Sequence, residues 1–146
     1  HHFAGPGNHF WRLLHEAGFT PVQYRPDEER ALLGHGLGIT NLIARPSRGE
    51  DDLEWSEFVE GGAALRERVR RFRPRIVALL GKNVYRAYAG LRRSDDVAWG
   101  LQPRETVEGV KEFAAPNPSP RSTLPYAERL RLFQALRALL QQECGE

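Results

Sequence analysis

The first segment of the chain carries the residue types best suited to hold a planar ring. Residues 1–8, called here the aromatic turn, read His-His-Phe-Ala-Gly-Pro-Gly-Asn and place Phe3 beside a Gly-Pro-Gly turn. Gly5 and Gly7 permit backbone geometries closed to other residues, and Pro6 fixes one φ angle between them. This pattern predicts a rigid aromatic loop at the start of a helix, where backbone N–H groups can point outward. The alternative is that Phe3 is a core residue packed at the start of that helix.

A second stiff loop lies near the other end of the chain. Residues 117–123, called here the proline loop, read Asn-Pro-Ser-Pro-Arg-Ser-Thr. Alternate prolines restrict their own φ angles and the conformations of the residues before them. The loop is therefore expected to present its serine and arginine side chains in a fixed arrangement.

The imidazole and thiol groups point to no metal centre. His1, His2 and His9 invite a general-base or metal role, but no Asp or Glu lies at ligand spacing from them in the sequence, so no metal site is expected. Cys144 is the only cysteine, which excludes an internal disulfide or a Cys₄ site and favours a reducing compartment. No nucleophile–base pair or glycine-rich phosphate fingerprint is present.

Apolar periodicity predicts the elements that position these loops. A helix starts after Asn8, the expected N-cap, and ends at Gly18, and a short helix runs from Pro26 to Gly34. Further on, the pattern predicts strands over 37–43, 76–80 and 110–115 and a helix over 82–89, with residues 99–103 irregular. Two longer helices are also expected. The first begins near Ser56, and its apolar face is Phe58, Leu65, Val69 and Phe72. The second lies near the end of the chain, and its apolar face is Leu132, Phe133, Leu136, Leu139 and Leu140.

This alternation predicts an α/β fold, a three-layer sandwich around a short, largely parallel central sheet. A chain of 146 residues fits a single domain, 1–146, with a core of ordinary size. No apolar run approaches about 20 residues, so no transmembrane helix is expected.

The positive charges are almost all arginine. The net charge is only +2, and lysine occurs only as Lys82 and Lys111. Arginine suits phosphate because its planar fork is always charged and binds in a bidentate manner. One helix carries a run of cations whose expected role is either a solvated helix end or a DNA contact: Arg66, Arg68, Arg70, Arg71, Arg73 and Arg75.

Five blocks in order resemble one enzyme family. They are the aromatic turn with the start of its helix, residues 38–47 (Gly-Ile-Thr-Asn-Leu-Ile-Ala-Arg-Pro-Ser), 79–82 (Leu-Leu-Gly-Lys), 100–103 (Gly-Leu-Gln-Pro) and 117–119 (Asn-Pro-Ser). The chain resembles the mismatch-specific uracil/thymine DNA glycosylases of the uracil-DNA glycosylase superfamily. Absence of a cysteine cluster argues against the iron–sulfur branches of that superfamily. The family's Gly-Ile-Asn-Pro-Gly strand, whose Asn positions the attacking water, would precede His1, so we expect a chain truncated at that first strand and reduced or absent activity.

The resemblance assigns roles around a flipped base. Phe3 stands where the family stacks an aromatic ring on the pyrimidine, and Asn8 where it fixes that loop. Asn41 and Ser47 stand where the vertebrate-type enzymes contact the base, although a turn residue is the alternative for Asn41. An amide suits uracil and thymine because it offers both a donor and an acceptor.

The proline loop resembles the family's second motif, which enters the minor groove and grips phosphate. The resemblance implies DNA contacts from Asn117, Ser119, Pro120, Arg121 and Ser122, with Ser119 binding phosphate through its N–H and hydroxyl. The loop departs from the family pattern, which has a small or apolar residue at position 120 and Arg at its end. Arg121 is our choice for the wedge that fills the gap, and a surface arginine on a turn is the alternative.

The implied protein is a monofunctional, monomeric glycosylase without cofactor that removes uracil or thymine from G·U or G·T mismatches in double-stranded DNA, leaving an abasic site. It would be cytoplasmic and nucleoid-associated in a bacterium, or nuclear in a eukaryote. A non-catalytic DNA- or lesion-binding module with the same fold is the main alternative. A small-molecule α/β enzyme is a more distant one.

Overall fold

The computed structural model describes residues 1–40, 42 and 53–144. The chain forms two compact units, one of His1–Thr40 with Pro116–Glu146 and the other of Asn41–Ala115.

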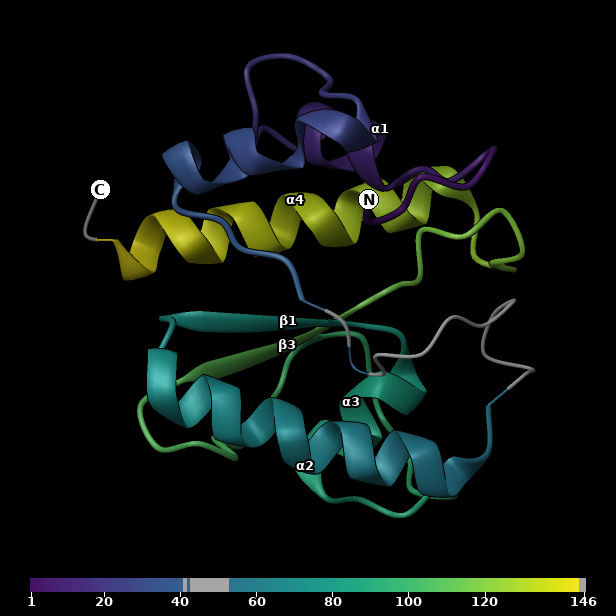
Figure 1. The fold of residues 1–146 in the computed structure, drawn as a ribbon, viewed down its shortest axis with the longest axis vertical. Coiled ribbons are helices and arrows are strands. Elements are labelled where there is room, and N and C mark those ends of the chain that lie inside the picture. Colours follow the sequence, from purple (N-terminus) through teal and green to yellow (C-terminus); the bar gives the residue numbers. More distant parts are fainter. Residues whose placement is uncertain (41, 43–52, 145–146) are drawn as a thin grey trace. The chain divides into compact units, whose positions relative to one another are not determined.

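The first unit is helical and is built on α1 (Phe10–Glu16) and α4 (Tyr126–Glu143), which pack together (Figure 1). Leu13 and Phe133 are among its buried residues. Gly18 follows the end of α1 with φ +94°, as expected for a residue just beyond a helix. The Nε of Arg137 donates to the Gly18 carbonyl at 3.0 Å, so α4 also fixes the end of α1.

The segment after α1 differs from two predictions. Pro26–His35 is a 3₁₀ helix, η1, which ends one residue beyond Gly34 because Gly36 takes the left-handed conformation at φ +76°. The predicted strand over 37–43 is not formed at residues 37–40, and positions 41 and 43 lie outside the described residues. The N–H of Leu37 donates to Leu32 at the end of η1, at 3.0 Å, so it is not available to a strand partner.

The second unit is a small sheet packed against two helices. Strands β1 (Ile76–Leu80) and β3 (Lys111–Ala115) are parallel, with Ile76 opposite Lys111 and Leu80 opposite Ala115. A third strand, β2 (Gly100–Leu101), pairs antiparallel with β3, giving the order β1-β3-β2. The sequence did not predict β2, because two residues show no alternation of apolar and polar side chains.

Helices α2 (Trp55–Phe72) and α3 (Lys82–Ala89) lie against this sheet and against each other (Figure 1). Their core includes Leu65, Leu79, Tyr85 and Tyr88. Gly62 makes the approach of the helices possible, since a Cβ at this position would lie on the main-chain carbonyl of Ala87.

One apolar position of α2 was wrongly predicted to be in the core. Phe72 is 74% exposed, because it is the last residue of the helix and Arg73 turns the chain away with φ +47°. Phe58, Leu65 and Val69 are buried as predicted.

The described residues confirm a mixed α/β fold with a short, largely parallel sheet. The single domain over residues 1–146 stays a prediction, as does a strand preceding His1.

Candidate functional site

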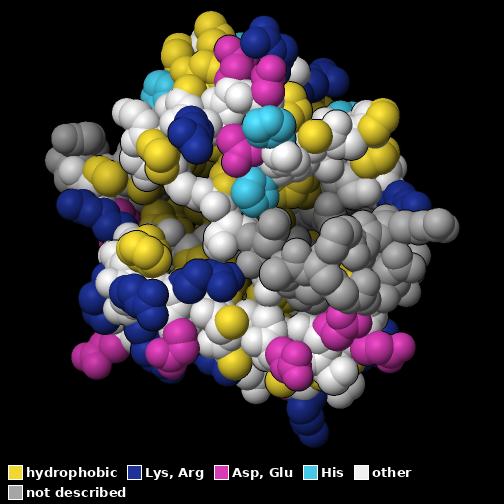
Figure 2. Space-filling view, viewed as in Figure 1, with side chains coloured by type: hydrophobic (Ala, Val, Ile, Leu, Met, Phe, Trp, Pro, Cys, Tyr) yellow, Lys and Arg dark blue, Asp and Glu magenta, His cyan; other side chains and the backbone are white. Residues whose placement is uncertain are grey.

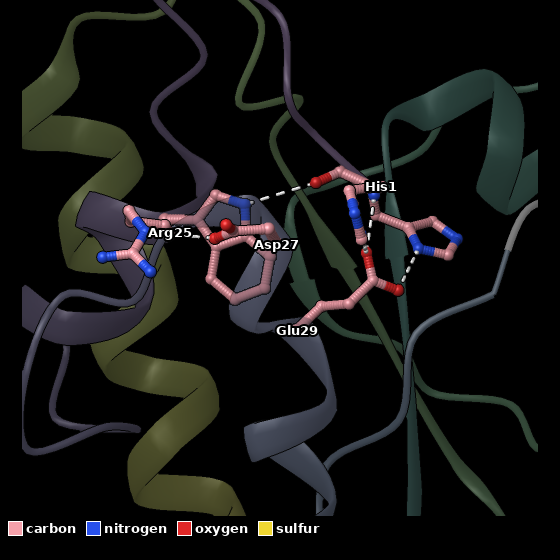
Figure 3. Close-up of polar contacts among 6 residues, drawn as sticks. His1, Arg25, Asp27 and Glu29 are labelled. Atoms are coloured by element: carbon pink, nitrogen blue, oxygen red, sulfur yellow. Dashed lines mark hydrogen bonds and ion pairs between the residues drawn. The ribbon is translucent and has the colours of Figure 1, made fainter.

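His2, the residue before Phe3, is held in place by hydrogen bonds to both its main-chain N–H and its main-chain carbonyl. The N–H of His2 donates to a carboxylate oxygen of Glu29 at 2.8 Å, and its imidazole Nδ1 lies 3.0 Å from the other oxygen (Figure 3). The indole N–H of Trp11 donates to the His2 carbonyl at 3.3 Å. The His2 hydrogen bonds, the main-chain one first, lower the pKa of Glu29, which keeps it a carboxylate. Glu29 therefore anchors the aromatic turn to η1. The sequence did not reveal this contact, because the two residues are 27 positions apart.

Phe3 is held in an unusual conformation against the core. Its φ is +57°, a left-handed value that is rare outside glycine. Its ring stacks on that of Phe10 with centroids 4.1 Å apart and planes at 28°. Phe3 is half-buried, whereas Phe10 is buried. The side chain therefore lies against the core, as one interpretation predicted, and keeps part of its ring accessible, as the other requires.

The polar groups at the start of α1 are arranged differently from the prediction. His9, not Asn8, is the N-cap residue, and its side chain makes no capping bond. The Asn8 carboxamide oxygen accepts the N–H of Phe10 at 2.9 Å, and the N–H of Asn8 itself donates to Gly5. The N–H of His9 donates to the Pro118 carbonyl at 2.9 Å.

These bonds mean that the predicted outward-pointing N–H groups at positions 8 to 10 are already used. Among the described residues, the main-chain N–H groups of Ala4 and Gly5 have no acceptor, and both residues are exposed. Donors for an incoming anion are therefore available in the aromatic turn itself, at Ala4 and Gly5.

The proline loop is closed by its own polar side chains. The Asn117 side-chain oxygen accepts the N–H of Ser119 at 2.9 Å, and the Ser119 hydroxyl oxygen accepts the N–H of Arg121 at 3.1 Å. The Ser122 hydroxyl oxygen accepts the N–H of Leu124 at 3.3 Å. The Ser119 N–H is therefore already bonded within the loop in this conformation, and its contact with phosphate stays a prediction. The outward donors are the Ser119 and Ser122 hydroxyl hydrogens and the exposed Arg121 guanidinium.

The two loops meet within the first unit. Besides the bond from His9 to Pro118, Gly7 lies against Pro120, whose Cβ would be 3.5 Å from a Cβ added at Gly7. Arg129 of α4 contacts both sides, with one guanidinium nitrogen 3.0 Å from the His9 Nδ1. The same guanidinium approaches the carbonyls of Ser119 at 3.4 Å and Asn117 at 3.5 Å.

Sequence reasoning missed Arg129, although a signal for it exists. Arg129 precedes Phe133 and Leu136 at helical spacing, so it is a charged residue on the apolar face of α4. It is only 4% exposed.

An aromatic and charged group borders the start of α1. The Tyr126 hydroxyl donates to Glu16 at 2.6 Å, and burial with this bond raises the pKa of Tyr126 to about 12. The Arg12 guanidinium lies over the Tyr126 ring, 4.3 Å from its centroid. Burial, followed by the nearby charges of Arg129 and Arg12, lowers the pKa of His9 below 6.5, so His9 is neutral at pH 7.

Two predicted base-contacting residues, Asn41 and Ser47, lie outside the described residues. The arginines of α2 make intramolecular contacts: Arg66 donates to the carbonyls of Ala87 and Tyr88, and Arg73 to that of Glu108. On the face that Figure 2 shows, cationic and acidic side chains are interspersed over the second unit. These contacts involve Arg66 and Arg73, and whether the arginine run is a solvated helix end or a DNA contact stays a prediction.

Two searches of the described residues bear on the class of protein. No group of three or more His, Cys, Asp or Glu side chains in ranges 1–40, 42 and 53–144 is arranged to hold a metal ion. None of the helices in those ranges has both the length and the apolarity to cross a membrane.

Comparison with protein families gives one match over almost the entire chain. The family model described as the uracil DNA glycosylase superfamily matches residues 1–141. The match includes both the aromatic turn and the proline loop, which the first unit brings together. The chain belongs to the uracil DNA glycosylase superfamily.

Proposed function

We propose that this protein is a mismatch-directed DNA glycosylase that extrudes uracil or thymine from G·U or G·T pairs and hydrolyses the glycosidic bond. Membership of the superfamily implies DNA glycosylase activity in base-excision repair and DNA as the partner. The mismatch preference and the roles of individual residues belong to the proposal.

One observation carries the proposal: in the first unit the aromatic turn meets the proline loop, because Gly7 lies against Pro120 and His9, the residue after the turn, donates its N–H to Pro118. An enzyme that acts on a base in duplex DNA must take that base out of the stack. It therefore needs a ring to stack on the base close to groups that hold the distorted backbone, and these two loops carry both.

Phe3 supplies the stacking surface in this proposal. Its ring already rests on Phe10, so a flipped pyrimidine on the accessible part of Phe3 would extend an existing stack. An aromatic side chain contributes about 1–3 kcal/mol per stacked base. The positive φ of Phe3 is a local strain of the kind that occurs at ligand-binding positions.

The proline loop supplies the grip on the DNA backbone. The Ser119 and Ser122 hydroxyl groups donate to phosphate oxygens, and Arg121 fills the gap left by the base or pairs with phosphate. Asn117 shapes the loop by accepting the Ser119 N–H, and Pro120 lies exposed beside Arg121.

The bond-breaking step needs no cofactor in this proposal. The sugar develops oxocarbenium character while negative charge develops on the departing base, and correctly placed donors stabilise that charge. The N–H groups of Ala4 and Gly5 are such donors. The amide N–H₂ of Asn8 is another, because only the oxygen of this side chain is used by the main chain. The base contacts that the resemblance implies for Asn41 and Ser47 stay predictions, because both residues lie outside the described residues.

A strand-cleavage assay tests the proposal. Fluorescent duplexes carrying G·U, G·T, A·U or G·C are incubated with the chain, and with a version extended by the coding sequence upstream of His1, and are then treated with alkali. We expect cleavage of G·U and G·T above A·U, with release of free base. Phe3→Leu should reduce cleavage, whereas Phe72→Leu, which alters an exposed ring of the second unit, should not. Mismatch binding without cleavage by either version would favour the non-catalytic binding module.

A further inference from the structure

Arg129 is a buried cation without a described anionic partner. It lies in the first turn of α4 and is 4% exposed. Among the described residues no carboxylate pairs with it, and its Nε has no hydrogen-bond acceptor. Burying a charge in this way is costly, so the groups that surround the guanidinium must compensate for its lost hydration.

The surrounding groups are neutral dipoles from the two loops. The shortest contact joins a guanidinium nitrogen to the Nδ1 of His9 at 3.0 Å. Longer contacts reach the carbonyl oxygens of Ser119 and Asn117 at 3.4 and 3.5 Å. The Tyr126 ring centroid lies 5.8 Å from the guanidinium carbon. Arg129 is therefore the side chain through which α4 contacts both the proline loop and the start of α1.

The chemistry of the pair fixes the protonation state of His9. A guanidinium has only donors, so the Nδ1 of His9 must be the acceptor and its proton must be on Nε2. The groups that face His9 are the cations Arg129 and Arg12 and the edge of the Tyr126 ring, whose hydroxyl is bonded to Glu16. Burial and the two cations lower the pKa of His9, in agreement with this geometry.

We propose that Arg129 is a positioning residue that, through neutral His9, holds the proline loop in register with the aromatic turn. This role deepens the proposed glycosylase function and rests on it. His9 makes two hydrogen bonds: its main-chain N–H donates to Pro118, and its Nδ1 accepts from Arg129. Arg129 also contacts the carbonyls of the residues on either side of Pro118. In this proposal the contacts of His9 and Arg129 surround the buried Pro118 and determine the distance between Phe3 and Ser119.

The pair also predicts a response to acid. Protonation of His9 replaces the acceptor at Nδ1 with a donor and places a second cation beside Arg129. The contact then becomes repulsive, and only the main-chain bond still joins the loops. DNA affinity at the site should therefore fall as the pH is lowered through the pKa of His9.

The first experiment is a titration of the full chain labelled with ¹⁵N-histidine. Two-bond ¹⁵N–¹H spectra should show His9 with an unprotonated Nδ1 and a protonated Nε2 at pH 7.5, titrating below 6.5. Arg129→Met should move this titration upward and, in a second sample labelled uniformly with ¹⁵N, shift the amide signals of Ser119 and Arg121. A matched control is Arg131→Met, which removes a cation of the same helix that pairs with Glu128.

The second experiment measures binding to a duplex that contains a stable abasic-site analogue opposite guanine. We expect Arg129→Met to lower affinity about tenfold, the equivalent of one charge-assisted hydrogen bond, with Arg129→Lys intermediate. His9→Asn keeps an acceptor near the Nδ1 position that cannot be protonated, so its affinity should stay constant between pH 5 and 7.5 while the wild-type affinity falls.

Each outcome decides the proposal. A protonated Nδ1 in the wild type, or a His9 titration unchanged in both Arg129 variants, would overturn it. If Arg129→Met does not fold, Arg129→Lys and His9→Asn carry the same comparison. The histidine titration needs no DNA, so it tests the role of Arg129 independently of any excision activity. If neither version of the protein excised uracil, that result would count against the glycosylase function but not against the role of Arg129.

Discussion

The main-chain N–H of His9 donates to the carbonyl oxygen of Pro118, 2.9 Å away, and joins two segments that are 109 positions apart in the sequence. Both are short and stiff, because one contains a Gly-Pro-Gly turn and the other alternating prolines. Because neither loop deforms easily, a hydrogen bond between them should pass a displacement of one loop on to the other. Any change that moves one loop is therefore expected to alter ligand binding at the other.

Gly7 gives a first test of this coupling. Its φ is +77° and it lies against Pro120, so Gly7→Ala introduces strain at the contact between the loops. We expect the melting temperature to fall by about 2–6 °C, since a left-handed alanine costs roughly 1–2 kcal/mol. Affinity for mismatched duplex should fall as well. The control is Gly34→Ala in the same unit, where an added Cβ meets no atom within 4 Å. Equal effects at both glycines would contradict the coupling.

Arg121 is predicted to act on DNA and not on stability. It is exposed, and among the described residues it has no ion-pair partner. Arg121→Gln should weaken duplex binding and reduce the slope of log affinity against log salt by about 1, with an unchanged melting temperature. Arg25→Gln is the matched control, because Arg25 is an exposed arginine of the same unit that pairs with Asp27 (Figure 3). An unchanged salt slope would mean that Arg121 is only a surface residue.

Gly62 of the second unit is predicted to be sensitive to substitution. A methyl group there would overlap the main-chain carbonyl of Ala87, and one turn further along α2 Arg66 donates to that same carbonyl. Gly62→Ala should lower the free energy of unfolding by about 1–3 kcal/mol, measured as a lower urea midpoint. Gly34→Ala, which meets no atom within 4 Å, should be neutral. A neutral Gly62→Ala would show that the helices can separate without cost.

The sequence predicted the regular elements better than the bonds between them. Apolar spacing identified β1, β3, α3 and the two long helices, because periodicity records which face of an element is buried. It did not reveal that Glu29 binds His2, that Arg129 contacts His9 or that β2 joins the sheet. Those features depend on residues far apart in the chain, or on a strand of two residues, and neither leaves a periodic pattern.

For the candidate site too, the sequence revealed the loops but not the hydrogen bonds within them. The aromatic turn and the proline loop were recognised from composition, since glycine and proline have strong local effects. The use of individual N–H groups was not recognised, because the side-chain oxygens of Asn117 and Asn8 accept main-chain N–H groups two residues further on, which are then no longer free donors.

Glu112 is predicted to be essential for stability. It is completely buried and accepts three hydrogen bonds, from the Tyr85 hydroxyl at 2.7 Å and from the N–H and hydroxyl of Thr106 at 2.8 and 3.0 Å. In Glu112→Gln the negative charge that strengthens these three bonds is lost, and the amide N–H₂ faces two hydroxyl groups that must then accept instead of donate. We expect a loss of about 1.5–3 kcal/mol in the free energy of unfolding, measured with urea. Glu60→Gln is the exposed control, and an equal effect of both would contradict the argument.

The acid sensitivity of the first unit follows from His9. Its pKa is lowered below 6.5 in the folded protein, chiefly by burial and then by Arg129 and Arg12. Between that lowered value and 6.5 the unfolded chain binds more protons than the folded one, so stability rises with pH in this window and is lost as the pH falls. The carboxyls with lowered pKa values, such as Glu29, act separately, at and below their ordinary value of 4.5.

Thermal melts from pH 7.5 down to pH 5 isolate this contribution when wild type and His9→Asn are compared. The wild-type melting temperature should fall more steeply with acid than that of His9→Asn. Above pH 6.5 the two proteins should show the same pH dependence, because His9 is neutral there in both the folded and unfolded states. His35→Asn is the control, because His35 contacts Tyr24 on the exposed side of η1. If the wild type and His9→Asn lost stability equally with acid, His9 would not be the group that titrates between the two loops.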